Sequence, residues 1–382
     1  MGRPKLLFWV CWLGKWHTYR QSPIIKHFSD FSDIVIFWFN DSYNYYCNEY
    51  RDNKNVRVFN VEVPWISWSV DWLDYRDTAN KEVNASKNFI KTNFLAMDAA
   101  LKFLWIPDLI ISDYEPVSAQ LSYSLWVPFI TIDQQSKYFI MEPEGLSWLS
   151  SKEEIARLGM FFPAADERIA CSFFNINKND EIYKATKNVQ IFPTIVREEI
   201  ISLKGEIKEK SNEILIYISP FSNFIQSANE VINILTKFKN YSFSIFVSPK
   251  SEFLSEDYVW LKNIKIYTHT NENFVKKIWN SVASICTWWH TFLSEMMYLW
   301  KPLYVIPLNT YEQNYNAKII DDNGFGIKVS CFEESMISYF LKNIARFKSN
   351  IAKDNKILNK ELWHTKIIKH IELNYLKNVM TK

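Results

Sequence analysis

The sequence predicts an α/β protein built from two Rossmann-like, doubly wound domains that face a central cleft. Runs rich in Ile, Val and Phe alternate with longer amphipathic stretches, which is the pattern of parallel βα units. The alternation is interrupted by a Lys/Glu-rich stretch, Leu203 to Glu213, and then resumes. A length of 382 residues also suits two domains better than one. We therefore expect functional residues at the carboxyl ends of both sheets.

In the first half, strands and helices follow each other in regular order. The predicted strands are Leu6–Leu13, Ile34–Phe39, Val56–Val61, Leu109–Ser112 and Phe129–Ile132, and the predicted helices are Ser22–Phe28, Asn84–Leu104 and Val117–Leu125. Ser22 is placed as the cap of the first helix, because Pro23 after it suits the opening helical position.

The second half repeats the alternation. Its predicted strands are Ile214–Ser219, Phe243–Val247, Ile264–Thr268, Ala283–Cys286 and Leu303–Pro307, and its predicted helices are Ser227–Lys239, Glu272–Asn280, Thr291–Leu299, Tyr315–Asn323 and the tail Lys356–Lys377. The expected organisation is a first domain over residues 1–195, a second over 196–355 and a C-terminal helix over 356–382. The several Lys residues of this C-terminal helix indicate a solvated face rather than a membrane anchor.

Composition excludes several classes of protein. A net charge of +2 gives no electrostatic footprint for nucleic acid. The five Cys residues are widely spaced and contain no CxxC, so we expect reduced thiols and no metal site. The apolar run Leu6–Leu13 is too short to span a membrane and lacks the small-residue cleavage site of a signal peptide. A cytoplasmic location is the expectation.

Glycine is scarce and tryptophan abundant. The chain has 7 Gly and 16 Trp, whereas usual glycine usage would give about 27. In three segments a helical stretch is followed by Trp, one further residue, Pro and an apolar strand, at Trp105, Trp126 and Trp300. That slot after a helix end usually adopts the left-handed conformation, which glycine enters without steric cost.

We interpret many of these tryptophans as glycines of the native protein. In some bacterial lineages UGA is read as glycine, and a standard decoding table would turn such codons into Trp. The alternative is a protein that is truly rich in Trp. Trp9, Trp12 and Trp16 around Gly14, and the pair Trp288-Trp289, also stand where a glycine-rich loop would be expected.

The most specific segment runs from Cys286 to Ile327. Its ordered features are His290, Thr291, Glu295, Pro302, Pro307, Gln313, Asn316, Ala317 and Gly324. The segment resembles the donor-nucleotide region of inverting GT-B glycosyltransferases, the group that includes UDP-glucuronosyltransferases and the peptidoglycan GlcNAc transferase. Trp288, Trp289 and Trp300 depart from that group, which has glycine at these places.

The resemblance assigns donor-binding roles to this segment. A loop that opens into a helix at Thr291 directs backbone N–H groups and the positive helix end at a diphosphate, and His290 could add a donor. The resemblance implies that Glu295 accepts both ribose hydroxyls. Glu312 and Gln313, expected in a loop after a strand, would bind the sugar ring, with Asn316 nearby. Each of these residues taken singly also has an ordinary structural interpretation.

The acceptor side is predicted near the N-terminus. With glycine restored, the segment from Phe8 to Arg20 is similar to the GxGHxxR opening of the same enzymes, so His17 resembles their general base. A dinucleotide-binding loop is the competing interpretation, but it has little support. Arg20 lies on the same helical face as His17 and is expected to contact an anionic group.

Carboxylates follow the fourth predicted strand and are candidates to orient His17. Asp113 is paired with His17, and Glu115 is the second candidate, although Asp113 could equally be a helix cap. Beyond the next strand, Asp133, Gln134 and Gln135 either line the acceptor pocket or form a turn.

The predicted activity is therefore metal-independent, inverting transfer of a hexosyl group to an acceptor hydroxyl, without a cofactor. The donor would be a nucleotide sugar, with UDP as the expected nucleotide, and the acceptor a glycan or a lipid-linked compound. Peripheral contact at the inner face of a membrane is compatible with such an acceptor. Two alternatives stay open. One is a nucleotide-sugar 2-epimerase of the same fold, and the other a non-catalytic protein whose Trp-rich loops stack on sugars.

Overall fold

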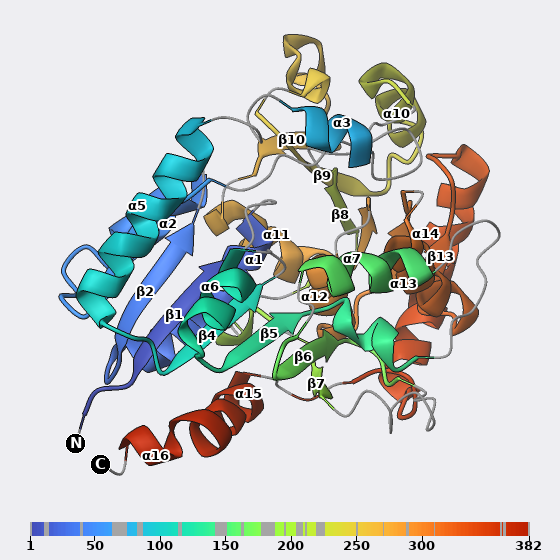
Figure 1. The fold of residues 1–382 in the computed structure, drawn as a ribbon. Helices are drawn as coiled ribbons and strands as arrows, with labels where there is room; N and C mark the ends of the chain where they lie inside the picture. Colours follow the sequence, from blue (N-terminus) through green and yellow to red (C-terminus); the bar gives the residue numbers. More distant parts are fainter. Residues whose placement is uncertain are drawn as a thin grey trace.

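The computed structural model describes most of the chain. The described residues are 2–10, 15–38, 41–62, 75–81, 87–113, 117–141, 151–161, 164–176, 188–194, 196–203, 209–210, 212–218, 226–249, 251–269, 271–287, 290–308, 310–359, 361 and 364–380. Within them, two separate parallel sheets are formed, one from each half of the chain (Figure 1). The predicted α/β class with two Rossmann-like domains is confirmed.

The first sheet has seven strands in the order β3-β2-β1-β4-β5-β6-β7. Their bounds are β1 Lys5–Val10, β2 Asp33–Trp38, β3 Val56–Asn60, β4 Leu109–Asp113, β5 Phe129–Asp133, β6 Glu167–Ser172 and β7 Val189–Pro193. Every pairing is parallel, and the order reverses between β1 and β4. Such a reversal opens a crevice at the carboxyl ends of the two central strands.

The second sheet repeats the arrangement with six parallel strands in the order β10-β9-β8-β11-β12-β13. Their bounds are β8 Glu213–Tyr217, β9 Ser242–Val247, β10 Ile264–Thr268, β11 Ala283–Cys286, β12 Leu303–Val305 and β13 Gly326–Lys328. Here the order reverses between β8 and β11. The chain passes from one sheet to the other between β7 and β8.

Helices connect the strands of both sheets. In the first half they are α1 Lys15–Ser29, α2 Asp41–Glu49, α3 Tyr75–Asn80, α5 Lys87–Leu104, α6 Val117–Leu125, the 3₁₀ turn η1 Ser136–Phe139 and α7 Ser151–Phe161. From the linker onward they are α9 Glu198–Ser202, α10 Ala228–Leu235, the 3₁₀ turns η2 Glu252–Leu254 and η3 Glu256–Tyr258, α11 Asn271–Asn280, α12 His290–Tyr298, α13 Tyr311–Asp322, α14 Glu334–Lys353, α15 His364–Ile371, the π-helical turn η4 Glu372–Leu376 and α16 Lys377–Met380.

The first helix was placed wrongly by the sequence pattern. α1 begins at Lys15, so Ser22 is not its cap and Pro23 lies inside the helix. Within the helix the Ser22 hydroxyl donates to the Thr18 carbonyl at 2.7 Å, which is a bond that a cap residue would not make. The helix is retained because Ile24, Ile25 and Phe28 are fully buried against the sheet. Apolar packing therefore outweighs the cost of the proline.

Tryptophan occupies each non-glycine left-handed position among the described residues. The φ angles are 67° at Trp105, 55° at Trp126 and 59° at Trp300, and Gly324 is the matching glycine with φ of 63°. The expected left-handed backbone at the three Trp-x-Pro slots is thus confirmed. Left-handed backbone costs an L-residue roughly 1–2 kcal/mol, because Cβ crowds the following carbonyl.

The two domains share an apolar core where they meet. Tyr19, Tyr138 and Phe174 of the first domain pack in one cluster with Phe292 and Tyr315 of the second. The chain then returns to its start, since Ile367, Ile371 and Leu376 are buried against the first domain. Figure 1 shows the C-terminal end of the chain, at α16, near the N-terminus. In the described parts of the chain, no helix combines the length and apolarity needed to cross a membrane.

Candidate active site

His17 and Asp113 meet at the point where the strand order of the first sheet reverses. His17 lies in α1, which follows β1, and Asp113 ends β4, the strand paired with β1 through Val10 and Asp113. The carboxyl ends of the two strands therefore bring the side chains together, with His17 Nδ1 and Asp113 Oδ1 3.0 Å apart. This is the pairing expected from the sequence, and both side chains are buried.

Asp113 is held as a carboxylate by its neighbours. Burial alone would raise its pKa, but Arg20, His17 and the amide of Gln21 outweigh burial and lower the pKa below its usual value. Arg20 Nη2 lies 3.1 Å from Asp113 Oδ1, and Gln21 Nε2 donates to Oδ2 at 3.1 Å. Arg20 Nη2 also lies 2.6 Å from His17 Nδ1, so the two contacts of Nδ1 favour opposite tautomers. The tautomer that donates from Nδ1 to the ionised Asp113 leaves the lone pair on Nε2.

Polar groups of the second domain lie opposite His17 and Asp113. They belong to α12, which follows β11 in the second sheet. His290 and Thr291 form its first turn and are both buried. Ser294 Oγ donates to the His290 carbonyl at 2.7 Å, so the 3.2 Å contact between Oγ and His290 Nδ1 is best made by an Nδ1–H. Burial, assisted by Lys137 and Arg20, lowers the pKa of His290 well below its usual value. His290 is therefore a neutral ring here.

Glu295 lies one turn further along α12 and is fully buried. Its two carboxylate oxygens accept from Arg197 Nε at 2.6 Å and Nη2 at 2.7 Å. A ribose bound as the resemblance implies would therefore share both oxygens with Arg197. Arg197 precedes α9 in the segment that links the sheets. The Glu295 carboxylate outweighs the effect of burial and raises the pKa of Arg197. Arg197 was not predicted from the sequence, because its partner Glu295 is 98 residues away and no local motif connects the two.

Glu312 and Gln313 lie on α13 and not in a loop, so their expected loop placement is corrected, whereas Asn316 lies on this helix as predicted. α13 begins at Tyr311, four residues before the predicted start, because Tyr311 and Tyr315 pack together in the interdomain core. Gln313 Oε1 accepts from the Leu308 backbone at 2.7 Å. Neither amide atom of Asn316 has a partner within the described residues, although the side chain is buried. Such a group commonly marks a ligand or water position.

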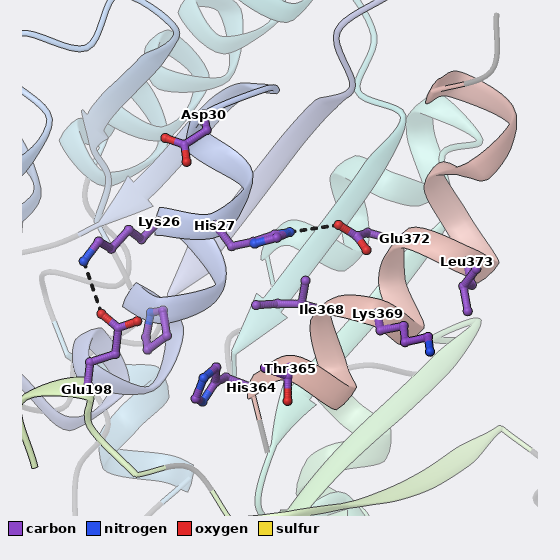
Figure 2. A pocket seen from close by; sticks show the side chains of 11 residues that line it. Lys26, His27, Asp30, Glu198, His364, Thr365, Ile368, Lys369, Glu372 and Leu373 are labelled. Carbon is purple, nitrogen blue, oxygen red and sulfur yellow. Dashed lines mark hydrogen bonds and ion pairs between the residues drawn. The ribbon is translucent and has the colours of Figure 1, made fainter. Parts of the chain in front are cut away.

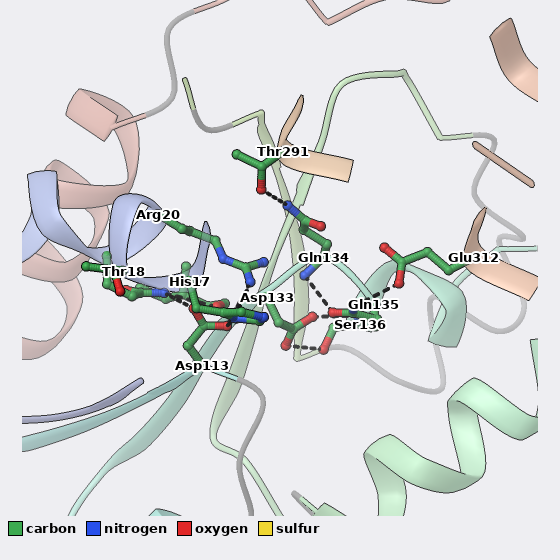
Figure 3. A network of polar contacts seen from close by, with 12 residues as sticks. His17, Thr18, Arg20, Asp113, Asp133, Gln134, Gln135, Ser136, Thr291 and Glu312 are labelled. Atoms are coloured by element: carbon green, nitrogen blue, oxygen red, sulfur yellow. Dashed lines mark hydrogen bonds and ion pairs between the residues drawn. The ribbon is translucent and has the colours of Figure 1, made fainter. Parts of the chain in front are cut away.

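The two domains touch along a polar seam, which we define as residues 133–138 of the first domain with the first turns of α12 and α13. Figure 3 shows Gln134 reaching Thr291 and Gln135 reaching Glu312, at 3.3 Å and 2.9 Å. Asp133 accepts from the backbone and hydroxyl of Ser136 at 2.7 and 2.8 Å. Asp133 thus has the turn role that was one of its two interpretations.

Some predicted residues lie outside the described part of the chain. These are Glu115, Trp12, Gly14, Trp288 and Trp289. Among the residues that are described, no group of three His, Cys, Asp or Glu side chains is arranged to hold a metal ion.

A surface cavity lies away from the seam. It has a volume of about 610 Å³ and is lined by His27 of α1, Glu198 of the linker, and His364 and Glu372 of the C-terminal helices (Figure 2). His27 Nε2 and Glu372 Oε1 are 2.8 Å apart. The cavity contains none of the predicted site residues.

The two Rossmann-like domains have the fold of the GT-B class of glycosyltransferases, and the His–Asp pair lies at the carboxyl ends of two central strands of the first sheet. Residues 4–345 match the model of Glycosyl transferase family 1, and the chain belongs to this family. None of the curated proteins matches the chain significantly.

Solved structures share the fold over nearly the whole chain at low identity. A UDP-glucose: anthocyanidin 3-O-glucosyltransferase in complex with UDP has a TM-score of 0.65 at 12% identity, covering 97% of this chain and 95% of that one. The glycotransferase of kitacinnamycin has a TM-score of 0.67 at 11% identity, with coverages of 98% and 100%. UGT89C1 of Arabidopsis thaliana has a TM-score of 0.62 at 11% identity, with coverages of 97% and 98%.

Proposed function

We propose that this glycosyltransferase moves a hexosyl group from a UDP-sugar to an acceptor hydroxyl with inversion at the anomeric carbon. The contact between His17 and Asp113 carries the proposal, because it provides a positioned base beside the seam with the second domain. The acceptor would bind the first domain and the donor the second. The UDP in the glucosyltransferase complex, a structure of the same fold, supports UDP as the nucleotide.

In the proposed reaction His17 Nε2 takes the proton of the acceptor hydroxyl as its oxygen attacks the anomeric carbon. Asp113 stabilises the imidazolium that forms, through the 3.0 Å contact with Nδ1. The bond from the anomeric carbon to the diphosphate breaks on the opposite face, so the centre inverts. The start of α12 then faces a diphosphate whose charge has increased, which a helix N-terminus stabilises. These groups perform the transfer without a metal ion.

We propose further that Trp9, Trp12, Trp16, Trp288, Trp289 and Trp300 are glycine in the native protein. Support comes from the left-handed backbone at Trp300, and from Trp9, whose indole N–H is buried without a partner in the described residues. Backbone approach to a diphosphate also requires small residues in the loop before α12. Peptide masses of the natively produced protein over residues 287–301 test this, and Trp masses at 288, 289 and 300 would contradict it.

Titration of UDP by calorimetry tests the donor. The chain with glycine at residues 9, 12, 16, 288, 289 and 300, called the glycine form below, is expected to bind UDP at micromolar concentration, whereas the chain as written is expected not to bind. The physical reason is that two indoles at 288 and 289 would fill the diphosphate space.

The outcomes of this titration separate the alternatives. No binding by either form would remove UDP as the donor. Binding followed by isomerisation of a UDP-sugar without any acceptor would instead indicate a 2-epimerase. Glycan binding without UDP affinity would indicate a non-catalytic protein.

The left-handed tryptophans give a separate prediction about stability. Trp126 is 94% exposed and therefore gains little from packing. Trp126→Gly is expected to raise the free energy of unfolding by about 1 kcal/mol, since glycine removes the left-handed strain but adds entropy to the unfolded chain. Urea denaturation measures this.

Trp260 provides the matched control for that measurement, because it is 87% exposed but has no positive φ. Trp260→Gly is expected to leave stability unchanged or to lower it by up to about 1 kcal/mol. Equal losses in both variants would contradict the strain argument.

A further inference from the structure

Lys137 is a fully buried lysine on the first-domain side of the seam. It lies in η1 directly after β5, and its ammonium donates to the Gln134 carbonyl at 2.7 Å. The side-chain amide of Gln134 in turn donates to Thr291 at 3.3 Å. Gln134 therefore links the ammonium of Lys137 to Thr291 at the start of α12.

The charge of Lys137 has no carboxylate partner within ion-pair distance among the described residues. Two of the nearby acids have other partners, because Asp133 accepts from Ser136 and Glu312 accepts from Gln135. The rings of Tyr138 and Phe174 lie 4.9 and 5.5 Å from the ammonium. Burial lowers the pKa of Lys137 to about 8, although Glu312, Asp133 and Glu154 oppose the shift. An unpaired buried cation is costly, so an anionic ligand would be stabilised beside it.

Other donors near the same seam are also unused. Arg20 is buried, and its Nε and Nη1 have no partner in the described structure, while Nη2 contacts both His17 and Asp113. Figure 3 shows Arg20 extending from α1 toward Asp113, on the side of Gln134 and Thr291. In the second domain, the buried Asn316 amide has an unpartnered donor in the residues described, whereas the unpartnered Nε2 of His290 is an acceptor in the neutral tautomer given above. Two buried cations of the first domain, Arg20 and Lys137, thus lie near the seam without a matching anion, facing neutral polar groups of the second domain.

We propose that Lys137, together with Arg20, binds the diphosphate of the nucleotide sugar from the first-domain side and stabilises it as the leaving group. This inference rests on the proposed function. As the bond from the anomeric carbon to the diphosphate oxygen breaks, its electron pair passes to that oxygen, while the acceptor proton goes to His17. Lys137 keeps its own proton and neutralises the increased charge. Leaving-group stabilisation is then complete only when the domains are in contact.

The test compares UDP and uridine binding to the glycine form and to its Lys137→Met variant by calorimetry. Methionine removes the charge and keeps an unbranched apolar side chain in the buried site. UDP affinity is expected to fall about 10- to 100-fold, while uridine affinity stays the same because uridine has no diphosphate. Lys137→Arg, which retains the charge, is expected to keep most of the UDP affinity.

Two further measurements make the result decisive. Lys91→Met removes an exposed lysine on α5 and is expected to leave UDP affinity unchanged. Thermal unfolding of Lys137→Met is expected to show undiminished stability, because an unpaired buried charge is lost. Unchanged UDP affinity in Lys137→Met, or equal losses for UDP and uridine, would overturn the inference. Failure of the parent glycine form to bind UDP would instead overturn the proposed donor, and this inference with it.

Discussion

His17→Ala in the glycine form is expected to lower kcat by about 10²–10⁴-fold, because the acceptor hydroxyl loses its general base. Asp113→Asn is expected to cause a loss of similar size, since an amide no longer stabilises the imidazolium or selects the Nδ1–H tautomer. A screen first identifies the UDP-sugar and acceptor that react fastest. The rate of UDP release with these substrates then measures both effects. UDP affinity should stay unchanged in both variants, because His17 would act on the acceptor and not on the nucleotide.

A second histidine of α1 serves as the control. His27 lies almost three turns further along and contacts Glu372 of the C-terminal helices, away from the seam. His27→Gln is expected to leave kcat within about twofold of the parent, since general acid–base catalysis needs contact with the reacting proton. If His17→Ala kept a rate comparable to that of His27→Gln, His17 would not be the base and the proposed mechanism would be wrong.

The largest effect on stability is expected at the pair of Arg197 and Glu295. Arg197→Met should lower the free energy of unfolding by about 3–5 kcal/mol, because it leaves a buried carboxylate without its cation. The exposed fractions of the two side chains are only 1% and 0%, so water cannot replace the missing partner. Chemical denaturation monitored by Trp fluorescence measures the change.

Two comparisons separate the ion pair from loss of packing. The double variant Arg197→Met with Glu295→Leu is expected to recover most of the lost stability, because no charge then stays buried. Lys26→Met breaks an ion pair with Glu198 whose side chains are 65% and 48% exposed, and should cost less than about 1 kcal/mol. If the double variant were no more stable than Arg197→Met, packing and not charge would be the cause.

Local pattern determined much of the fold. The strands β1, β4 and β5 lie where the apolar runs predicted them, because a strand buried on both faces must be apolar throughout. The left-handed backbone at the Trp-x-Pro slots follows from helix-end geometry alone. The approach of His17 to Asp113 could also be predicted, since both residues follow or end strands that are central in a doubly wound sheet.

Other features were not predicted from the local sequence pattern. β6 and β7 were missed, because their short apolar segments lie in a region without a motif. The helix α14 was also missed, although it buries Ile337, Phe340 and Ile344 at helical spacing. α13 begins earlier than predicted because tyrosines at its start pack against the first domain.

The sequence by itself thus determined the two-domain α/β class, the left-handed tryptophan slots and the candidates for a nucleotide-sugar site. Tertiary structure decided which charges are paired. Arg197 reaches Glu295 across 98 residues, and Gln134 reaches Thr291 across 157. Lys137 is buried in η1, whose next residue, Tyr138, packs against Tyr311 and Tyr315 of the second domain. The physical reason is that periodicity reports which face of an element is apolar, whereas the cost of burying a charge depends on atoms that only the folded domains bring together.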